Sequence, residues 1–215
     1  MKAKKVTKFQ HYIRLAFIFM GATLIIATLI FSFTIGDFLG KMGETVVYSN
    51  DYYSLKGNPT EYQKTLFKEL TAELKKDNPD DRQIAALVVE NFISDFYTWS
   101  NKLGTYDVGG KEFIYFKEFT NFDQTSRRNF MLTMSNYLSK GLEPKDLNEV
   151  DSITITFSDH SNGYDYYGTK LDSYYVTATW TYKANDKIDV SVFPQFAEFT
   201  VVKSENGRYE IAQFY

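Results

Sequence analysis

The pattern of apolar and polar positions changes twice along the chain. Residues 15–36 are apolar and carry no charge. Residues 59–140 repeat apolar side chains every three or four positions, whereas residues 150–215 alternate apolar and polar side chains. The first period is that of helices and the second is that of strands. This order predicts an α+β fold, with helices packed on an antiparallel sheet, behind one long apolar segment.

The apolar segment 15–36 has the length of a transmembrane helix, since a rise of ~1.5 Å per residue extends it over ~33 Å, about one hydrocarbon core. Basic residues and no acidic residue precede it: Lys2, Lys4, Lys5, Lys8 and Arg14. Because positive flanks remain inside, we expect residues 1–14 to be a cytoplasmic tail and the domain to be extracytoplasmic. A cleaved signal peptide and a buried core helix are the competing interpretations. The first fits poorly, because its apolar region would be shorter and end in small residues.

Residues 37–58 contain several glycines and no clear period, so we expect a linker, with a strand-like piece at residues 45–48. Thr60 and Gln63 then have the spacing of a helix capping box. They predict an amphipathic helix over residues 59–77. We expect the α+β domain itself to comprise residues 78–215.

Within that domain, residues 80–100 are apolar around most of a helix, which predicts burial against a sheet. A glycine-containing loop over residues 101–111 and a short strand over residues 112–119 are expected next. A third helix is predicted over residues 124–140, and Gly141 is placed to end it in a left-handed conformation.

Four alternating runs are predicted strands: residues 151–159, 172–184, 187–204 and 208–215. Asn206 and Gly207 form a strong hairpin signal that requires positive φ at both turn positions. Pro194 predicts a bulge or bend, because a central strand does not tolerate proline.

The last strand has two possible facings. We expect Tyr209, Ile211, Gln213 and Tyr215 to point into the core, because the opposite facing would bury the carboxylate of Glu210.

The helix RQIAALVVENFISDFYTW and the terminal pair FAEFTVVKSENGRYEIAQFY carry a resemblance to the nuclear transport factor two-like superfamily. The resemblance covers roughly residues 80–215 and implies a cone of helices wrapped by a strongly bent sheet. In layout the chain is similar to the membrane-anchored inner-membrane scaffold proteins of type IV secretion and conjugation systems. It departs from them in the extra helix over residues 59–77.

Charge and composition narrow the classes of function. The chain has 24 basic and 27 acidic residues. Without the five basic residues of the N-terminal tail, 19 basic and 27 acidic residues remain, which gives a net charge of −8. An acidic exterior domain is a poor nucleic-acid binder. The chain has no cysteine, which excludes disulfides, thiolate metal sites and thiol nucleophiles.

Residues suited to catalysis are sparse. His160 would need Asp159 or Asp165 and a serine for a triad, but no serine has the surroundings of a nucleophile elbow. Ser158 breaks the calcium-loop spacing around Asp159. We therefore expect no enzyme activity, no metal site and no cofactor.

Two groups of aromatic residues are candidate contact sites. Five tyrosines are candidates for partner contact, although they could also line both faces of a hairpin: Tyr164, Tyr166, Tyr167, Tyr174 and Tyr175. Four rings could line a pocket or simply fill the core: Phe92, Phe96, Trp99 and Trp180.

These features predict a non-catalytic, single-pass membrane protein with an extracytoplasmic scaffold domain, a subunit of a bacterial secretion or conjugation assembly. Its expected partners are the membrane and other protein subunits, including copies of itself, and not nucleic acid. The alternative is a module that binds a small ligand, a lipid or a cell-wall component in the cone. A filled core with exposed aromatic patches favours the scaffold, and a large empty cavity favours the binding module.

Overall fold

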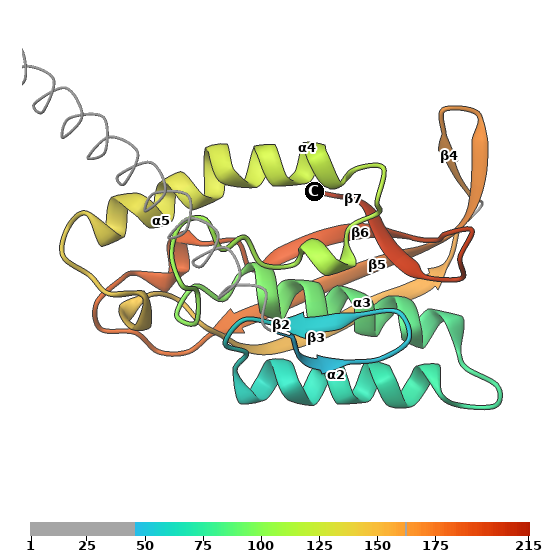
Figure 1. The fold of residues 1–215 in the computed structure, drawn as a ribbon, viewed down its shortest axis with the longest axis horizontal. Coiled ribbons are helices and arrows are strands. Elements are labelled where there is room, and N and C mark those ends of the chain that lie inside the picture. The colour runs from blue at the N-terminus through green and yellow to red at the C-terminus, as the bar shows by residue number, and fades with distance from the viewer. Residues whose placement is uncertain (1–45, 162) are drawn as a thin grey trace, which may run out of the picture. The chain divides into compact units, whose positions relative to one another are not determined.

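The computed structural model describes residues 46–161 and 163–215, which belong to one compact unit, Thr45–Tyr215 (Figure 1). The predicted tail (1–14) and spanning segment (15–36) lie outside the described residues. None of the helices that are described is long and apolar enough to cross a membrane.

The sheet is antiparallel, and its main path runs in the order β3-β5-β6-β7. A short strand, β4, pairs with the start of β5 and extends this sheet as a hairpin. The bounds are β3 (Val150–His160), β4 (Tyr164–Tyr166), β5 (Thr169–Tyr182), β6 (Phe196–Lys203) and β7 (Tyr209–Phe214). All four predicted strands are therefore present.

Helices pack on one face of this sheet, with α3 against the strands and α2 against α3 (Figure 1). The bounds are α2 (Glu61–Leu74), α3 (Asp81–Phe96), α4 (Phe119–Thr125), a π-helical segment (Ser126–Phe130) and α5 (Met131–Leu138). Short 3-10 turns occupy Lys111–Phe113, Pro144–Asp146 and Val190–Val192. The predicted class, α+β with helices on an antiparallel sheet, is confirmed.

The start of α2 follows the predicted capping box. The N–H of Gln63 donates to Oγ1 of Thr60 over 3.2 Å, and the N–H of Thr60 donates to Oε1 of Gln63 over 2.7 Å. Leu66, Phe67 and Leu70 of α2 are buried in the domain core. The helix is therefore part of the domain, and the predicted domain start at residue 78 is too late.

A hairpin occupies much of the expected linker. It consists of β1 (Val46–Ser49) and β2 (Ser54–Lys56), paired antiparallel. Tyr53 and Leu55 are buried, and the hydroxyl of Tyr53 donates to the carbonyl of Tyr209 over 2.7 Å. These buried side chains attach the segment to the core, so the linker prediction is wrong for the described part of residues 37–58, although the strand-like piece expected at residues 45–48 corresponds to β1.

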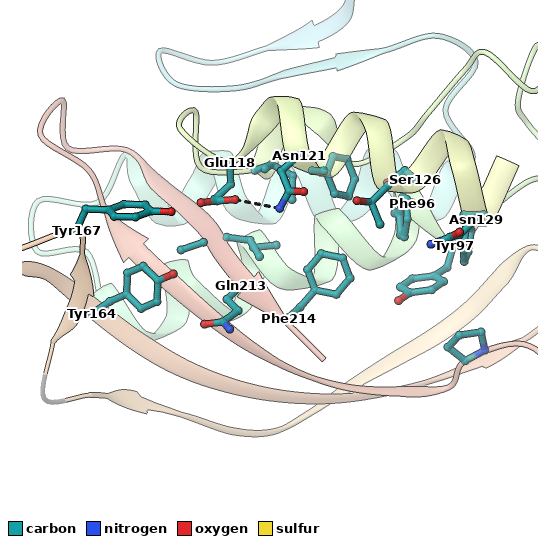
Figure 2. Close-up of a pocket in the computed structure, with 17 residues that line it drawn as sticks. Phe96, Tyr97, Glu118, Asn121, Ser126, Asn129, Tyr164, Tyr167, Gln213 and Phe214 are labelled. Carbon is teal, nitrogen blue, oxygen red and sulfur yellow. Dashed lines mark hydrogen bonds between the residues drawn. The ribbon is translucent and has the colours of Figure 1, made fainter.

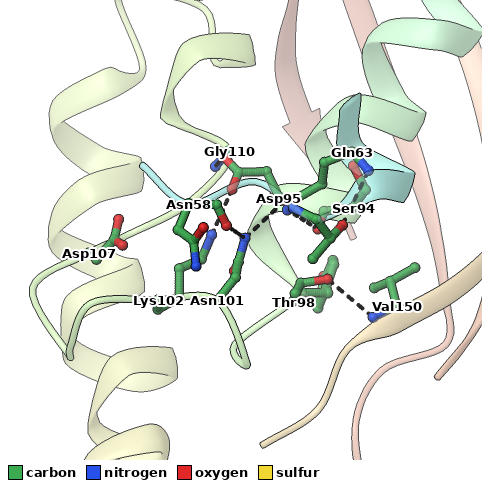
Figure 3. Close-up of polar contacts among 12 residues, drawn as sticks. Asn58, Gln63, Ser94, Asp95, Thr98, Asn101, Lys102, Asp107, Gly110 and Val150 are labelled. Atoms are coloured by element: carbon green, nitrogen blue, oxygen red, sulfur yellow. Dashed lines mark hydrogen bonds and ion pairs between the residues drawn. The ribbon is translucent and has the colours of Figure 1, made fainter. Parts of the chain in front are cut away.

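An ion pair between a buried lysine and a half-buried aspartate holds the glycine loop onto the end of α3 (Figure 3). Nζ of Lys102 lies 2.6 Å from Oδ1 of Asp95, and the Lys102 side chain is only 3% exposed. The other carboxylate oxygen accepts from the N–H of Gly110 over 2.7 Å. A Cβ at Gly109 would lie 2.3 Å from the Asp95 carbonyl oxygen, so only glycine fits there.

Further polar contacts join α2 to the same region (Figure 3). Nε2 of Gln63 donates to the carbonyl of Ser94 over 2.8 Å, and Nδ2 of Asn101 donates to Oε1 of Gln63 over 2.9 Å. Because these bonds fix the last turn of α3, they also fix Phe96 and Tyr97, which line the groove described below.

The strand expected over residues 112–119 is not formed. Ile114 makes a single parallel bridge to Ile211, and the N–H of Glu118 then closes a turn on the carbonyl of Tyr115 over 2.8 Å. That turn leads directly into α4, five residues before the predicted start of the third helix. Gly141 has a φ of 92°, as predicted.

The loop between β6 and β7 and the position of Pro194 both differ from the prediction. The N–H of Gly207 donates to the carbonyl of Ser204 over 2.8 Å, and Gly207 has positive φ whereas Asn206 does not. This is a longer hairpin loop than the two-residue turn expected. Pro194 precedes β6 instead of bending it.

The predicted facing of β7 holds only for its first half. Tyr209 and Ile211 are buried in the core, but an irregularity opposite Thr200 and Val201 shifts the register of β7. Phe214, not Gln213, then packs on Phe199 and Phe92 in the core, with ring centroids 5.8 and 5.2 Å apart. A bulge of this kind adds one residue and so reverses the facing beyond it.

Glu210 is buried, contrary to expectation, because the second face of β7 is covered as well. A small second core forms there from Tyr115, Leu171, Val202 and Ala212, with Tyr164 and Tyr166 packed against it. Burial raises the pKa of the Glu210 carboxyl, while Arg208, with Nε 3.5 Å from Oε1, opposes the rise.

Glu90 predicts a pH-dependent contribution to stability. Burial, followed by the charge of Glu69, raises the pKa of its carboxyl from 4.5 to about 7. A raised carboxyl pKa stabilises the fold fully below pH 4.5, and that stabilisation is lost as the pH rises through 7. Between pH 5 and pH 8, urea unfolding of Glu90→Gln should therefore show about 1–2 kcal/mol less decline in unfolding free energy than wild type, a figure reduced for partial solvent screening. Equal declines in the two proteins would contradict the assignment.

Candidate functional site: a groove beside the β7 edge

A cavity of about 680 Å³ lies between β7 and the helical segment formed by α4 and the π-helical turn (Figure 2). The end of α3 forms its back, and the β4 hairpin overhangs one end of it. The volume falls within the range of ligand pockets, roughly 300–1,000 Å³. We refer to this cavity as the β7 groove.

Aromatic rings form the floor of the β7 groove. Phe96 stacks on Phe130 with centroids 4.6 Å apart and lies 5.3 Å from Phe122. Phe214 completes the floor, 6.3 Å from both Phe96 and Phe122. These rings belong to three elements, α3, the α4 region and β7, so the floor exists only in the folded domain.

Polar side chains form its rim. Glu118, Asn121, Thr125 and Asn129 come from the helical side, and Gln213 comes from β7 (Figure 2). Nδ2 of Asn121 donates to Oε2 of Glu118 over 3.3 Å. An apolar floor with a few convergent polar groups is the usual composition of a binding site.

The helical wall of the groove contains an irregular turn. The N–H of Met131 donates to the carbonyl of Ser126, five residues earlier, so residues Ser126–Phe130 are π-helical. Ser126 and Asn129 both line the groove. Such π-turns occur frequently at functional sites.

The predicted tyrosine group divides into three parts. Tyr164 and Tyr167 line the groove from the β4 hairpin, and Tyr167 is 92% exposed with a φ of 48°. Tyr166 packs edge-on against Tyr115 and Tyr167, with centroids 5.4 and 4.8 Å away. Burial, followed by the nearby Glu118 carboxylate, raises the pKa of Tyr164.

The other two tyrosines lie elsewhere. Tyr174 is buried, and its hydroxyl donates to Oδ2 of Asp81 over 3.0 Å. Tyr175 lies beside Phe157, with centroids 6.1 Å apart, on the sheet face away from the helices. The five residues therefore do not form one contact surface.

The predicted pocket-lining group is also divided. Phe96 lines the β7 groove, but Phe92, Trp99 and Trp180 are 0%, 1% and 3% exposed and fill the core.

His160 pairs with a residue that the sequence did not single out. Its Nε2 lies 2.5 Å from Oδ1 of Asp172, on the neighbouring strand. Asp165 instead accepts from the N–H of Gly168 over 2.8 Å, within its own hairpin. In the described part of the chain, no cluster of three or more potential metal ligands is present.

Sequence reasoning missed the helical wall of the groove, including Glu118, Asn121 and Thr125. The sequence predicts a strand over residues 112–119 and a helix only from residue 124, so the first part of α4 is not predicted. The available signal was the spacing of Phe119 and Phe122, which fits a helix beginning before residue 124.

Comparisons with known proteins give no family: no protein-family model, no curated protein and no solved structure matches this chain. The function is therefore inferred from the chemistry of the β7 groove.

Proposed function

We propose that this chain is a non-catalytic binding protein, anchored by one membrane helix, whose extracytoplasmic domain holds a ligand in the β7 groove. The ligand has an apolar part that contacts the phenylalanine floor and polar groups that meet the rim. The observation that carries the proposal is the cavity itself, about 680 Å³ with an aromatic floor. A concave, largely apolar surface with a few polar groups at its rim is the usual form of a ligand site.

The membrane location in this proposal rests on the sequence. The uncharged segment 15–36 and the basic residues before it support an anchor with the domain outside.

The proposed fold family is the nuclear transport factor two-like superfamily. A helical layer on one face of the sheet supports it, as do the register irregularities in the β3–β5 and β6–β7 pairs. Bulges bend and twist a sheet, as a cone requires.

A scaffold subunit of a secretion or conjugation assembly is the second candidate. Exposed rings on the outer sheet face favour it: Phe157 is 48% exposed and Phe196 is 54% exposed. Threonines such as Thr177 and Thr179 separate these rings, so the apolar area is broken up. The β7 groove, with its continuous aromatic floor, is the stronger feature.

The test compares two adjacent exposed positions on the helical wall. Thr125 lines the groove, whereas Gln124 does not. Thr125→Phe should fill the groove, and Gln124→Phe adds the same ring outside it. Ligand-observed NMR with a library of small amphipathic fragments should find compounds that bind wild type and Gln124→Phe but not Thr125→Phe.

Both variants should unfold at the same temperature as wild type, since each changes an exposed residue. The proposal is wrong if no fragment distinguishes the two variants.

A further inference from the structure

The β7 strand forms one edge of the sheet, because only β6 pairs with it along the main path. In an antiparallel pair, residues alternate between bonding the partner strand and directing both backbone groups away from it. The outward residues of β7 therefore expose N–H and C=O groups on the side away from β6. Such an edge can accept a further strand unless it is covered.

The first outward positions are covered by the protein itself. At Tyr209 the Tyr53 hydroxyl bonds both backbone groups, accepting from the N–H over 3.0 Å and donating to the carbonyl over 2.7 Å. At Ile211 the carbonyl accepts from the N–H of Tyr115 over 2.9 Å.

The last outward position is open. Glu198 and Tyr215 exchange two backbone hydrogen bonds, of 3.3 and 3.1 Å, so this pair bonds across the β6–β7 ladder. Phe214, one residue earlier, is paired with Phe199 and therefore directs its N–H and C=O away from β6. No other residue in the described ranges bonds either group.

The chain leaves space beside this position. Ile114 and Tyr115 begin to pair with β7, but the turn closed by Glu118 carries the chain away into α4. Beyond that turn, the space between the edge of β7 and the helical wall is the β7 groove (Figure 2).

We propose that the ligand of the β7 groove is an extended peptide segment of a partner protein, which adds a strand to the edge of β7 at Phe214. This inference rests on the proposed function and specifies its ligand. The groove follows β7 from Ile211 to Phe214, a length of ~13 Å, so about four extended residues lie within it. Main-chain hydrogen bonds supply affinity in this mode, and pockets for alternate side chains supply specificity.

The walls define the side chains of that peptide. The phenylalanine floor around Phe96 and Phe122 accepts apolar side chains. Glu118 is the charged residue among those that line the groove, and the domain as a whole is acidic. The peptide therefore carries a lysine or arginine that reaches Glu118, next to its apolar residues.

The test begins with a phage-displayed library of random octapeptides, selected on the full chain and counter-selected on Thr125→Phe. The selected peptides should have apolar residues at alternate positions and carry a basic residue.

The best peptide is then synthesised with each amide N-methylated in turn. Because Phe214 offers one open carbonyl to an added strand, N-methylation of the single peptide amide that bonds it should weaken binding about tenfold or more, and N-methylation of the neighbouring amides should have little effect. Glu118→Gln should weaken binding of the basic peptide but not of its neutral analogue.

The outcomes separate this inference from the function on which it rests. Peptides that lose binding in Thr125→Phe but tolerate N-methylation at every position would overturn strand addition and leave the groove as a binding site. Failure to select any peptide that distinguishes Thr125→Phe from Gln124→Phe would overturn the peptide ligand. If the amphipathic fragments then also fail to distinguish these variants, the proposed function fails as well.

Discussion

A chain that ends at Arg208 is expected not to fold. Removal of Tyr209–Tyr215 deletes β7, in which Ile211 is fully buried and Phe214 packs on Phe92. Burying each large apolar side chain contributes about 1.5–3 kcal/mol, and a domain has only about 5–15 kcal/mol in total. The deletion also removes the backbone partner of the Tyr53 hydroxyl and exposes the edge of β6.

Circular dichroism and limited proteolysis of the full-length and shortened chains would check this expectation. Deletion of Tyr215 alone is the matched control, because this side chain is 74% exposed and only its backbone bonds Glu198. The control should unfold cooperatively, with a loss of about 1–2 kcal/mol. Cooperative unfolding of the chain that ends at Arg208 would show that β7 is dispensable.

Lys102→Met is expected to destabilise the domain by about 1.5–3 kcal/mol, since it leaves the Asp95 carboxylate, which is 24% exposed, without its cation. The Lys102 side chain is 3% exposed and its Nζ lies 2.6 Å from Asp95, so water cannot easily replace it. The methionine keeps much of the packing volume, and the loss therefore reports mainly on the charge. Urea unfolding at neutral pH measures it.

The double variant Lys102→Met with Asp95→Asn separates the pair from the packing. Removal of both charges should recover part of the stability, because the neutral amide is easier to bury and still accepts from the N–H of Gly110. A loss below about 1 kcal/mol in the single variant would mean that the pair behaves as an exposed one.

Much of the fold follows from local sequence. The helical and alternating periods are properties of short windows, which is why α2, α3 and four strands were predicted. The capping box of Thr60 and Gln63 and the left-handed Gly141 are local in the same sense.

The features that sequence did not predict depend on contacts between distant segments. The β1–β2 hairpin is held by Tyr53, whose backbone partner Tyr209 is 156 residues away. Glu210 is buried among groups that include the backbone of Phe116, a residue far earlier in the chain. The shift in β7 that brings Phe214 into the core leaves no pattern in the alternating run itself.

The groove combines both kinds of feature. Phe96 was a candidate because α3 is locally recognisable, and Tyr164 and Tyr167 were candidates because tyrosines suit contact surfaces. The first turns of its helical wall, before residue 124, are not predicted because α4 begins without a side-chain cap. Only the folded chain brings these three elements to one edge of the sheet.

If ligands enter the β7 groove, mapping of amide chemical shifts will locate them between β7 and the helical wall. The ¹⁵N-labelled full chain would be titrated with a fragment that binds wild type but not Thr125→Phe. Binding in the groove should shift the amide resonances of Ile211–Phe214 and of Glu118–Phe130, including the amide of Phe214. Shifts confined to the outer sheet face, around Phe157 and Tyr175, would contradict it and favour the scaffold.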